Sequence, residues 1–330
     1  MVSGLFIGIL FGGLLQSGQF CFVSGFRNIL YQRNTRFLTA LLIAVTIQSV
    51  GFFALESAGL LHIPEGNLPI TATLAGGFLF GAGMVLAGCC GSGAWFRSGE
   101  GLTGTWIALF AFVVTMATAQ KGSLKHWFEP LLQHPAQPDT IYKTLDISPW
   151  FLVAFLIILT AGLLIYQHYH PRYTPPSQGR FNYLPLNITG MLIGILGIIA
   201  WVFSAEAGRN FGYGVAVPSG NVIQYLITGQ QRYFNWGTLF VIGIFAGSMI
   251  SAVIRKEFRL RLPPDGITVV KRLTGGIVMG AGATLAGGCT VTNSLVATAY
   301  FSWQGWISTF MIMAGVWITS YFFRSGQCRL

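Results

Sequence analysis

A glycine-rich apolar segment that stops at a cysteine occurs twice in this chain. The first copy, AGGFLFGAGMVLAGCCGSG, covers residues 75–93, and the second, TGGIVMGAGATLAGGCTVT, covers residues 274–292. Of all residues 53% are hydrophobic and 8% are charged, and several apolar runs reach about 20 residues, the length that spans a bilayer. These runs are continuous and do not alternate as β-barrel strands do, so the sequence predicts an all-α polytopic membrane protein.

Hydropathy predicts about nine transmembrane helices. The expected spans are residues 2–20, 37–59, 70–88, 101–120, 149–167, 187–206, 236–254, 271–288 and 303–323. Most of the 19 Lys and Arg residues fall on the cytoplasmic side when the N-terminus is periplasmic and the C-terminus cytoplasmic. Topology therefore explains the net charge of +10 without nucleic-acid binding. The first span has no basic leader and no cleavage site, so it is expected to be retained.

The repeat extends beyond the cysteine segments. GLFIGIL at residues 4–10 matches GMLIGIL at residues 190–196. The single membrane domain, residues 1–330, then divides into a first repeat (1–120), a linker with one transmembrane helix (121–186) and a second repeat (187–330). An odd number of crossings separates the two copies, so the sequence predicts inverted-topology repeats.

Four segments are too short to span a bilayer but amphipathic enough to form re-entrant half-helices. They are residues 21–30, 91–99, 218–229 and 290–300. Half-helix N-termini at membrane depth present free N–H groups and the positive end of the helix dipole, which bind anions. The nine Asp and Glu residues lie in predicted loops or near the ends of spans. This distribution disfavours cation transport.

Three of the five cysteines, Cys21, Cys90 and Cys289, stand at the starts of predicted half-helices. A buried structural thiol is the ordinary alternative for each of them taken singly. Equivalent breaks in two antiparallel copies converge near the pseudo-two-fold axis, however, so we expect these three to line a substrate path. Cys89 is a possible supporting residue, and Cys328 is expected to be a solvated bystander. An odd cysteine count in an apolar setting makes a disulfide scaffold unexpected.

Neighbouring small and polar residues are the expected supporting shell. They are Ser24, Gly88, Cys89, Gly91, Ser92, Asn221, Gly288, Thr290 and Asn293, with Arg27, Asn28, Asn210, Ser219, Thr292 and Ser294 as a wider polar set. Helix capping is the more frequent role of Ser, Thr and Asn at helix starts. Repeated glycines at four-residue spacing are expected to serve packing. Trp201 and Trp236 are either interface anchors or walls of the site. All histidines fall in predicted loops, so no metal site and no cofactor are expected.

These motifs carry a resemblance to a known family. The doubled GAGxxLAG[CG]C segment, the Gly18–Cys21 sequence GQFC and the nine-span layout resemble the YeeE/YedE family of bacterial inner-membrane proteins along essentially the whole chain. The resemblance implies thiosulfate uptake through an hourglass-shaped helical protein whose central path is lined by three cysteines, here Cys21, Cys90 and Cys289. The Cys89–Cys90 doublet departs from the second repeat, which has glycine at the first position.

The chemistry of thiosulfate fits such a path. The ion is a compact dianion with a soft terminal sulfur, to which a neutral thiol is a weak donor, whereas a thiolate would repel it. We therefore expect protonated cysteines and a relay from Cys289 near the outside, through Cys90, to Cys21. The resemblance also implies a small cytoplasmic sulfur-carrier protein, with residues 255–266 as its docking surface, although these basic residues equally serve topology near anionic lipid.

Two other readings stay open. One is transport of another sulfur or selenium compound; copper is disfavoured because no methionine cluster or histidine pair accompanies the cysteines. The other is a membrane sulfurtransferase, which would be an enzyme and would need a thiolate, although no Lys or His lies within a few residues of the cysteines. The sequence favours a transporter over an enzyme.

Overall fold

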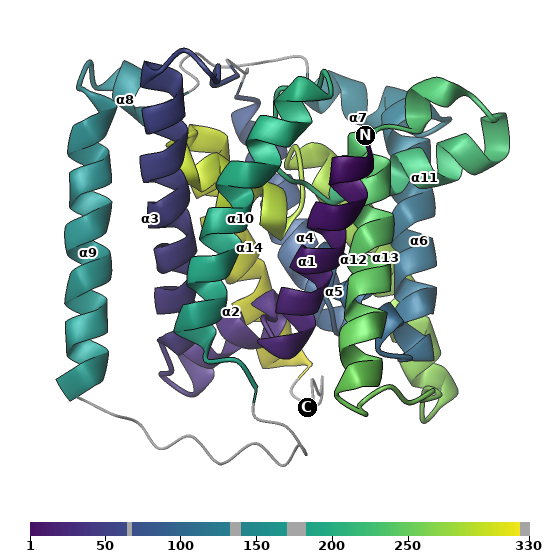
Figure 1. The fold of residues 1–330 in the computed structure, drawn as a ribbon. Coiled ribbons are helices and arrows are strands. Elements are labelled where there is room, and N and C mark those ends of the chain that lie inside the picture. The colour runs from purple at the N-terminus through teal and green to yellow at the C-terminus, as the bar shows by residue number, and fades with distance from the viewer. Residues whose placement is uncertain (65–67, 133–139, 170–182, 324–330) are drawn as a thin grey trace.

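The protein is an all-α bundle whose long helices run between two opposite faces (Figure 1). The computed structural model describes residues 1–64, 68–132, 140–169 and 183–323, and these contain no β-strand, only two isolated bridges. The long helices are α1 (Val2–Ser17), α3 (Arg36–Ser57), α4 (Ile70–Ala87), α6 (Thr103–Lys121), α9 (Pro149–Tyr169), α10 (Leu186–Glu206), α12 (Trp236–Ile254), α13 (Gly266–Leu285) and α14 (Trp303–Phe322). Each coincides with a span predicted from hydropathy.

Eight helical segments of the described chain are long and apolar enough to cross a membrane. The remaining long helix, α13, begins at Gly266 and not at residue 271, so the predicted start was wrong. The reason is a local cap: the Asp265 carboxylate accepts a hydrogen bond from Thr268 N at 3.0 Å and starts the helix early. Lys271 and Arg272, expected in a loop, therefore lie inside α13 and lower its hydropathy.

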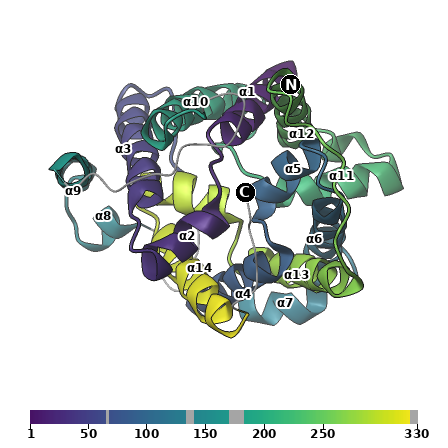
Figure 2. The same ribbon diagram turned by 90° about the horizontal axis from the view of Figure 1, so that it is seen from below.

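Four short helices occupy the predicted half-helix segments. They are α2 (Phe22–Tyr31), α5 (Gly91–Gly99), α11 (Ala216–Thr228) and η2, a π-helix (Val291–Ala297). Every residue of α5 is buried, although the segment has few large apolar side chains. Figure 2 shows α5 toward the interior, with α1, α12, α6 and α13 around it. The remaining short helices, α7 (Lys125–Leu132), α8 (Ile141–Thr144) and η1 (Gln231–Tyr233), lie in connections.

The helix packing repeats itself with the two halves exchanged. α1 packs on α12 as α10 packs on α3, and α4 packs on α14 as α13 packs on α6. In sequence order α1, α3, α4 and α6 correspond to α10, α12, α13 and α14, so each contact of one half has its counterpart in the other. Exchanging the two halves maps the α4–α13 contact onto itself, and likewise the α1–α10 contact. This is the packing that a two-fold axis between inverted repeats produces.

Glycines bring α4 and α13 together at the centre. A Cβ on Gly76 would collide with the backbone nitrogen of Ala286, and a Cβ on the equivalent Gly275 would collide with that of Ala87. The two contacts are each other's symmetry counterparts. The glycine spacing therefore serves close backbone approach, as predicted, and it fixes the place where both cysteine segments begin.

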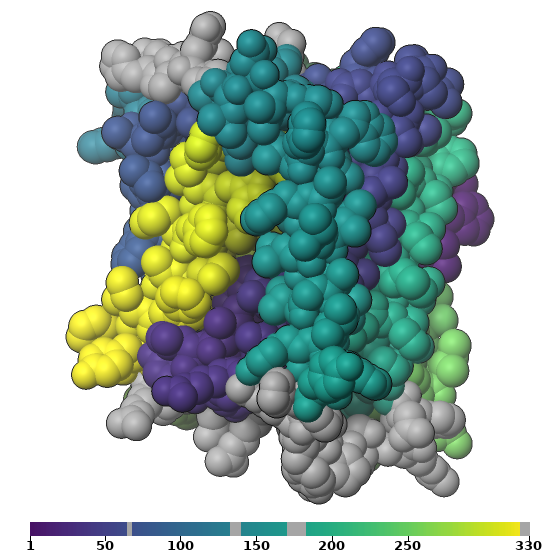
Figure 3. Space-filling view, turned by 90° about the vertical axis from the view of Figure 1, so that its left-hand side faces the viewer, coloured from purple at the N-terminus to yellow at the C-terminus, as the bar shows by residue number. Residues whose placement is uncertain are grey.

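The linker helix α9 stands at the edge of the bundle (Figures 1 and 3). Only 17% of its most apolar stretch is buried. It is attached to α3 by hydroxyl and amide contacts, with Thr46 Oγ1 and Thr160 Oγ1 2.9 Å apart and Gln167 Nε2 donating to Thr39 Oγ1 at 2.6 Å. The rest of α9 presents apolar side chains outward, as expected of a helix that faces lipid.

Candidate functional site

Each of the three predicted path cysteines stands at the start of a short buried helix. Cys21 is the N-cap of α2 and Cys90 is the N-cap of α5. Cys289 directly precedes Thr290, the N-cap of η2. The three side chains are buried, with 4%, 1% and 0% of their surface exposed. The N-cap position borders the N–H groups that have no partner within the helix, so the thiols lie at sites of positive potential.

A hydroxyl accompanies each of these thiols. Ser24 Oγ donates to Cys21 Sγ at 3.6 Å, Ser92 Oγ lies 3.4 Å from Cys90 Sγ, and Thr292 Oγ1 lies 3.7 Å from Cys289 Sγ. Cys90 Sγ also accepts a hydrogen bond from Gly93 N at 3.2 Å, which makes the thiol itself the helix cap. The recurring unit is thus a thiol and a hydroxyl at the start of a short helix, which offers a soft contact and a polar donor to one ligand.

The two cysteine segments meet where α4 and α13 end. A Cβ on Gly91 would lie 3.4 Å from the Cβ of Cys289, so the absence of a side chain there lets the segments approach. The Thr290 side chain lies beside Cys90, and its Oγ1 is buried without a hydrogen-bond partner among the described residues. Cys21 is close enough to Cys90 for an electrostatic interaction between them. The fold therefore brings the three predicted thiols to one region.

The fourth half-helix breaks the symmetry. Ser219-Gly220 of α11 matches Ser24-Gly25 of α2, which puts Ala216 in the place of Cys21. The Ser219 hydroxyl is occupied, because it accepts from Trp95 Nε1 at 2.8 Å and donates to Val215 O at 2.6 Å. The N-terminus of α11 therefore lacks the thiol–hydroxyl unit of the other three.

The expected supporting residues divide by role. Gly88 has φ of +71°, a left-handed turn that ends α4 and places the cysteines behind it. Asn293 Nδ2 donates to Ala286 O and Gly288 O, both at 3.1 Å, so it caps the end of α13 and is structural. A Cβ on Gly288 would lie 2.5 Å from Thr292 Cγ2, so close packing explains that glycine.

Two further expected residues belong to none of the thiol–hydroxyl pairs. Asn221 lies on α11, and no hydrogen bond joins its side chain to another described residue. Cys89 is fully buried, and its Sγ lies 3.7 Å from Ala87 O. Arg97 and Arg272 are both close enough to Cys89 to act on it electrostatically. Cys328 lies outside the described residues.

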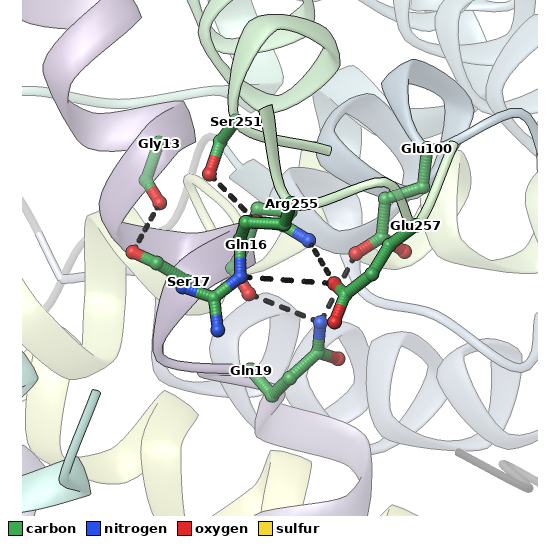
Figure 4. A network of polar contacts seen from close by, with 8 residues as sticks. All are labelled: Gly13, Gln16, Ser17, Gln19, Glu100, Ser251, Arg255 and Glu257. Carbon is green, nitrogen blue, oxygen red and sulfur yellow. Dashed lines mark hydrogen bonds and ion pairs between the residues drawn. The ribbon is translucent and has the colours of Figure 1, made fainter. Parts of the chain in front are cut away.

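A buried polar network at the ends of α1 and α12 was not predicted (Figure 4). Gln16 Nε2 donates to Glu257 Oε2 at 2.7 Å, and Gln19 Nε2 donates to Glu100 Oε1 at 3.1 Å. Ser251 Oγ completes it by donating to Gln16 Oε1 at 2.6 Å. Burial is the main reason why the pKa of Glu100, just beyond α5, is raised. In the sequence, the only sign of this network was the pair Gln16 and Gln19, just before Cys21.

One cavity, of about 360 Å³, does not reach the thiols. It lies between α6, α7, α11 and α13, and no cysteine lines it. Among the described residues, no three His, Cys, Asp or Glu side chains lie close enough together to hold a metal ion. The thiol region is thus a buried cluster of hydrogen-bond donors.

A bundle of membrane-crossing helices with buried half-helices around donor groups defines a multi-pass membrane transport protein. A profile of the sulphur transport family matches residues 17–318, and the chain belongs to that family. It is 40% identical to the thiosulfate transporter TsuA of Escherichia coli K12, over 97% of this chain and 94% of that protein. It is 29% identical to TsuA of Spirochaeta thermophila, over 97% and 98%. A probable transporter, YedE of E. coli, is 28% identical over 49% of this chain and 39% of its own length.

Proposed function

We propose that this protein takes up thiosulfate across the bacterial inner membrane through a path lined by Cys21, Cys90 and Cys289. The observation that carries the proposal is the recurring unit of a buried thiol, a hydroxyl and a helix N-terminus at all three positions. The similarity to two proteins named thiosulfate transporters supports the choice of substrate. The protein is a transporter in this proposal and not an enzyme.

The chemistry follows from the geometry of the units. A dianion that leaves water needs donors, and backbone N–H groups and hydroxyls supply them at the three thiols. A fixed Lys or Arg at the same depth would retain the ion, whereas neutral thiols contact the soft sulfur weakly enough to release it. We propose that the three thiols stay protonated, because burial disfavours the thiolate.

The direction of transport rests on topology. We propose a periplasmic N-terminus and a cytoplasmic C-terminus, supported by the basic loop after α12 and by the opposite faces at which α1 begins and α14 ends (Figure 1). The ion then passes from Cys289 through Cys90 to Cys21. The same proposal includes the division into repeats at 1–120 and 187–330. It also includes a small cytoplasmic sulfur-carrier protein that docks at the loop of residues 255–266.

The test is growth on thiosulfate of a bacterium that lacks its own sulfate and thiosulfate importers. Cys90→Ser is the sharpest variant, because serine keeps a cap for Gly93 N and removes only the soft sulfur. We expect growth with the intact chain and none with Cys90→Ser at matched amounts of membrane-inserted protein. Equal growth of both would refute the thiol path and keep the transporter. No growth of either, with both inserted, would favour another sulfur or selenium compound or a sulfurtransferase.

A further inference from the structure

The connection between α10 and α11 holds a partly buried arginine in a fixed position. Arg209 Nη1 donates to Gly212 O at 2.8 Å, to Ser204 Oγ at 3.1 Å and to Phe211 O at 3.4 Å. Its guanidinium lies over the rings of Phe211 and Trp236, with centroids at 5.5 and 5.9 Å. Trp236 is itself buried, so it is a wall of this pocket and not an interface anchor. The guanidinium is thus held by its own loop before any ligand arrives.

No carboxylate of the described residues pairs with Arg209. Desolvation is the one cause that lowers its pKa, to about 10, so the side chain stays charged at neutral pH. Within the described part of the chain, its hydrogen bonds all come from Nη1, which leaves Nε and Nη2 to other acceptors. A partly desolvated cation without a countercharge costs free energy, and an anion bound beside it would offset that cost.

Arg209 and Thr292 both border Gly214. A Cβ on Gly214 would lie 3.5 Å from Arg209 Nη2 and 3.0 Å from Thr292 Oγ1, so these two atoms are at most the sum of these distances, 6.5 Å, apart. One oxyanion bridges such a separation by accepting a hydrogen bond from each group, and Gly214 has no side chain to come between them. Thr292 Oγ1 is also 3.7 Å from Cys289 Sγ. An oxyanion bound there through an oxygen would lie next to the first thiol of the proposed path.

The site belongs to one mouth of the protein. Trp236 Nε1 donates to Ser3 Oγ at 3.2 Å, which places the site at the face where the chain begins. The equivalent connection of the first repeat, between Ser17 and Phe22, is shorter and has no arginine. The additional loop in the second repeat therefore gives this face a cationic group that the opposite mouth lacks at the equivalent position.

We propose that Arg209 and Thr292, which border the side-chain-free Gly214, form an outer binding site for divalent oxyanions, which delivers its ligand to Cys289. The identity of the transported ion rests on the proposed function. The site recognises oxygens, whereas the thiols recognise a soft sulfur. Sulfate then occupies the outer site without passing the thiols and acts as a competitive inhibitor of thiosulfate uptake.

The test measures binding and uptake on the same variants. Gly214→Ala puts a methyl group against Arg209 Nη2 and Thr292 Oγ1 and keeps the charge, and Gly214 has no positive φ that would strain alanine. Arg209→Lys keeps the charge but loses the planar fork, and Arg209→Gln loses both. Gly162→Ala on α9 is the matched control, since nothing lies within 4 Å of its added Cβ. Binding of thiosulfate and of sulfate to the purified full-length protein is measured by titration calorimetry, and the KM by radiolabelled uptake into cells.

We expect Gly214→Ala and Arg209→Gln to weaken binding of both ions and to raise the KM for thiosulfate by at least about tenfold. Gly162→Ala should not change either quantity, and Arg209→Lys should have an intermediate effect. Unchanged binding and KM in folded Gly214→Ala and Arg209→Lys, or no oxyanion binding by the parent protein, would overturn the inference. If the parent binds oxyanions in a manner that depends on Arg209 but imports no thiosulfate, the proposed function fails and the outer site stands.

Discussion

Alanine at Gly275 should separate the two central helices and disturb the site that they position. In the structure, an added Cβ meets the Ala87 backbone, with Ala87 Cα and Leu86 C both 2.8 Å away. Ordinary carbon–carbon contacts are about 3.5–4.0 Å, so α13 and α4 must move apart by about 1 Å. Neither contact atom is the end of a flexible side chain, so rotation of a side chain cannot relieve the overlap.

The magnitude follows from packing. An added methyl group in a filled core costs about 1–3 kcal/mol, and the rigid backbone partner puts Gly275→Ala toward the upper end. Cys90 and Cys289 lie just beyond the ends of α4 and α13, so the same shift moves both thiols. A misplacement of about 1 Å at a site can reduce a rate about 100-fold. We therefore expect a clear loss of thermal stability together with a large loss of uptake.

The measurement is the melting temperature of the detergent-purified protein, with thiosulfate uptake at matched expression. Gly162→Ala on the outer helix α9 is again the control, and it should match the parent protein in both assays. The symmetry-related Gly76→Ala should behave like Gly275→Ala, because its Cβ meets the Ala286 backbone. A Gly275→Ala protein that melts and transports like the parent would refute the close approach of α4 and α13.

Two further predictions concern titratable groups outside the spans. Burial raises the pKa of Glu100, so its charged form is disfavoured in the folded state. Stability should therefore fall as the pH rises from the unfolded-state pKa through the folded-state pKa. Glu100→Gln should flatten this pH dependence in melting curves, and an unchanged slope would contradict the prediction. Asp265 should give stability the opposite pH dependence. The hydrogen bonds from Thr268 lower its pKa, so the stability that it contributes is present above the unfolded-state pKa and lost as the pH falls through the folded one. Asp265→Ala should lower the melting temperature at neutral pH, and the difference from the parent should shrink in acid.

Local patterns accounted for much of the architecture. Nine apolar runs predicted the long helices, and four short amphipathic segments predicted α2, α5, α11 and η2. Both patterns are properties of consecutive residues, so they can be recognised in the sequence without knowledge of the fold. The start of α13 was missed because hydropathy places a boundary at Lys271 and Arg272, whereas the Asp265 cap begins the helix before them.

The site was predicted in part. The repeat identified Cys21, Cys90 and Cys289, and the structure brings them together at three helix starts. Glu100 and Glu257 were assigned to loops, and their partners Gln16 and Gln19 come from α1 and the residues just after it, far apart in sequence. Arg209 was counted only as a loop charge. Nothing next to it in the sequence shows that it packs against Trp236 or that Thr292 lies nearby.

The sequence by itself determined the class of the protein and the number and approximate place of its long helices, because hydropathy is a linear quantity. From spacing and internal repetition it also predicted the inverted relation of the halves and a path lined by three cysteines. Only the tertiary structure decided which hydroxyl accompanies each thiol, which glycines face a backbone and where the Arg209 side chain lies. Those facts depend on contacts between helices that are remote in the chain, and such contacts arise only when the two halves pack around their common axis.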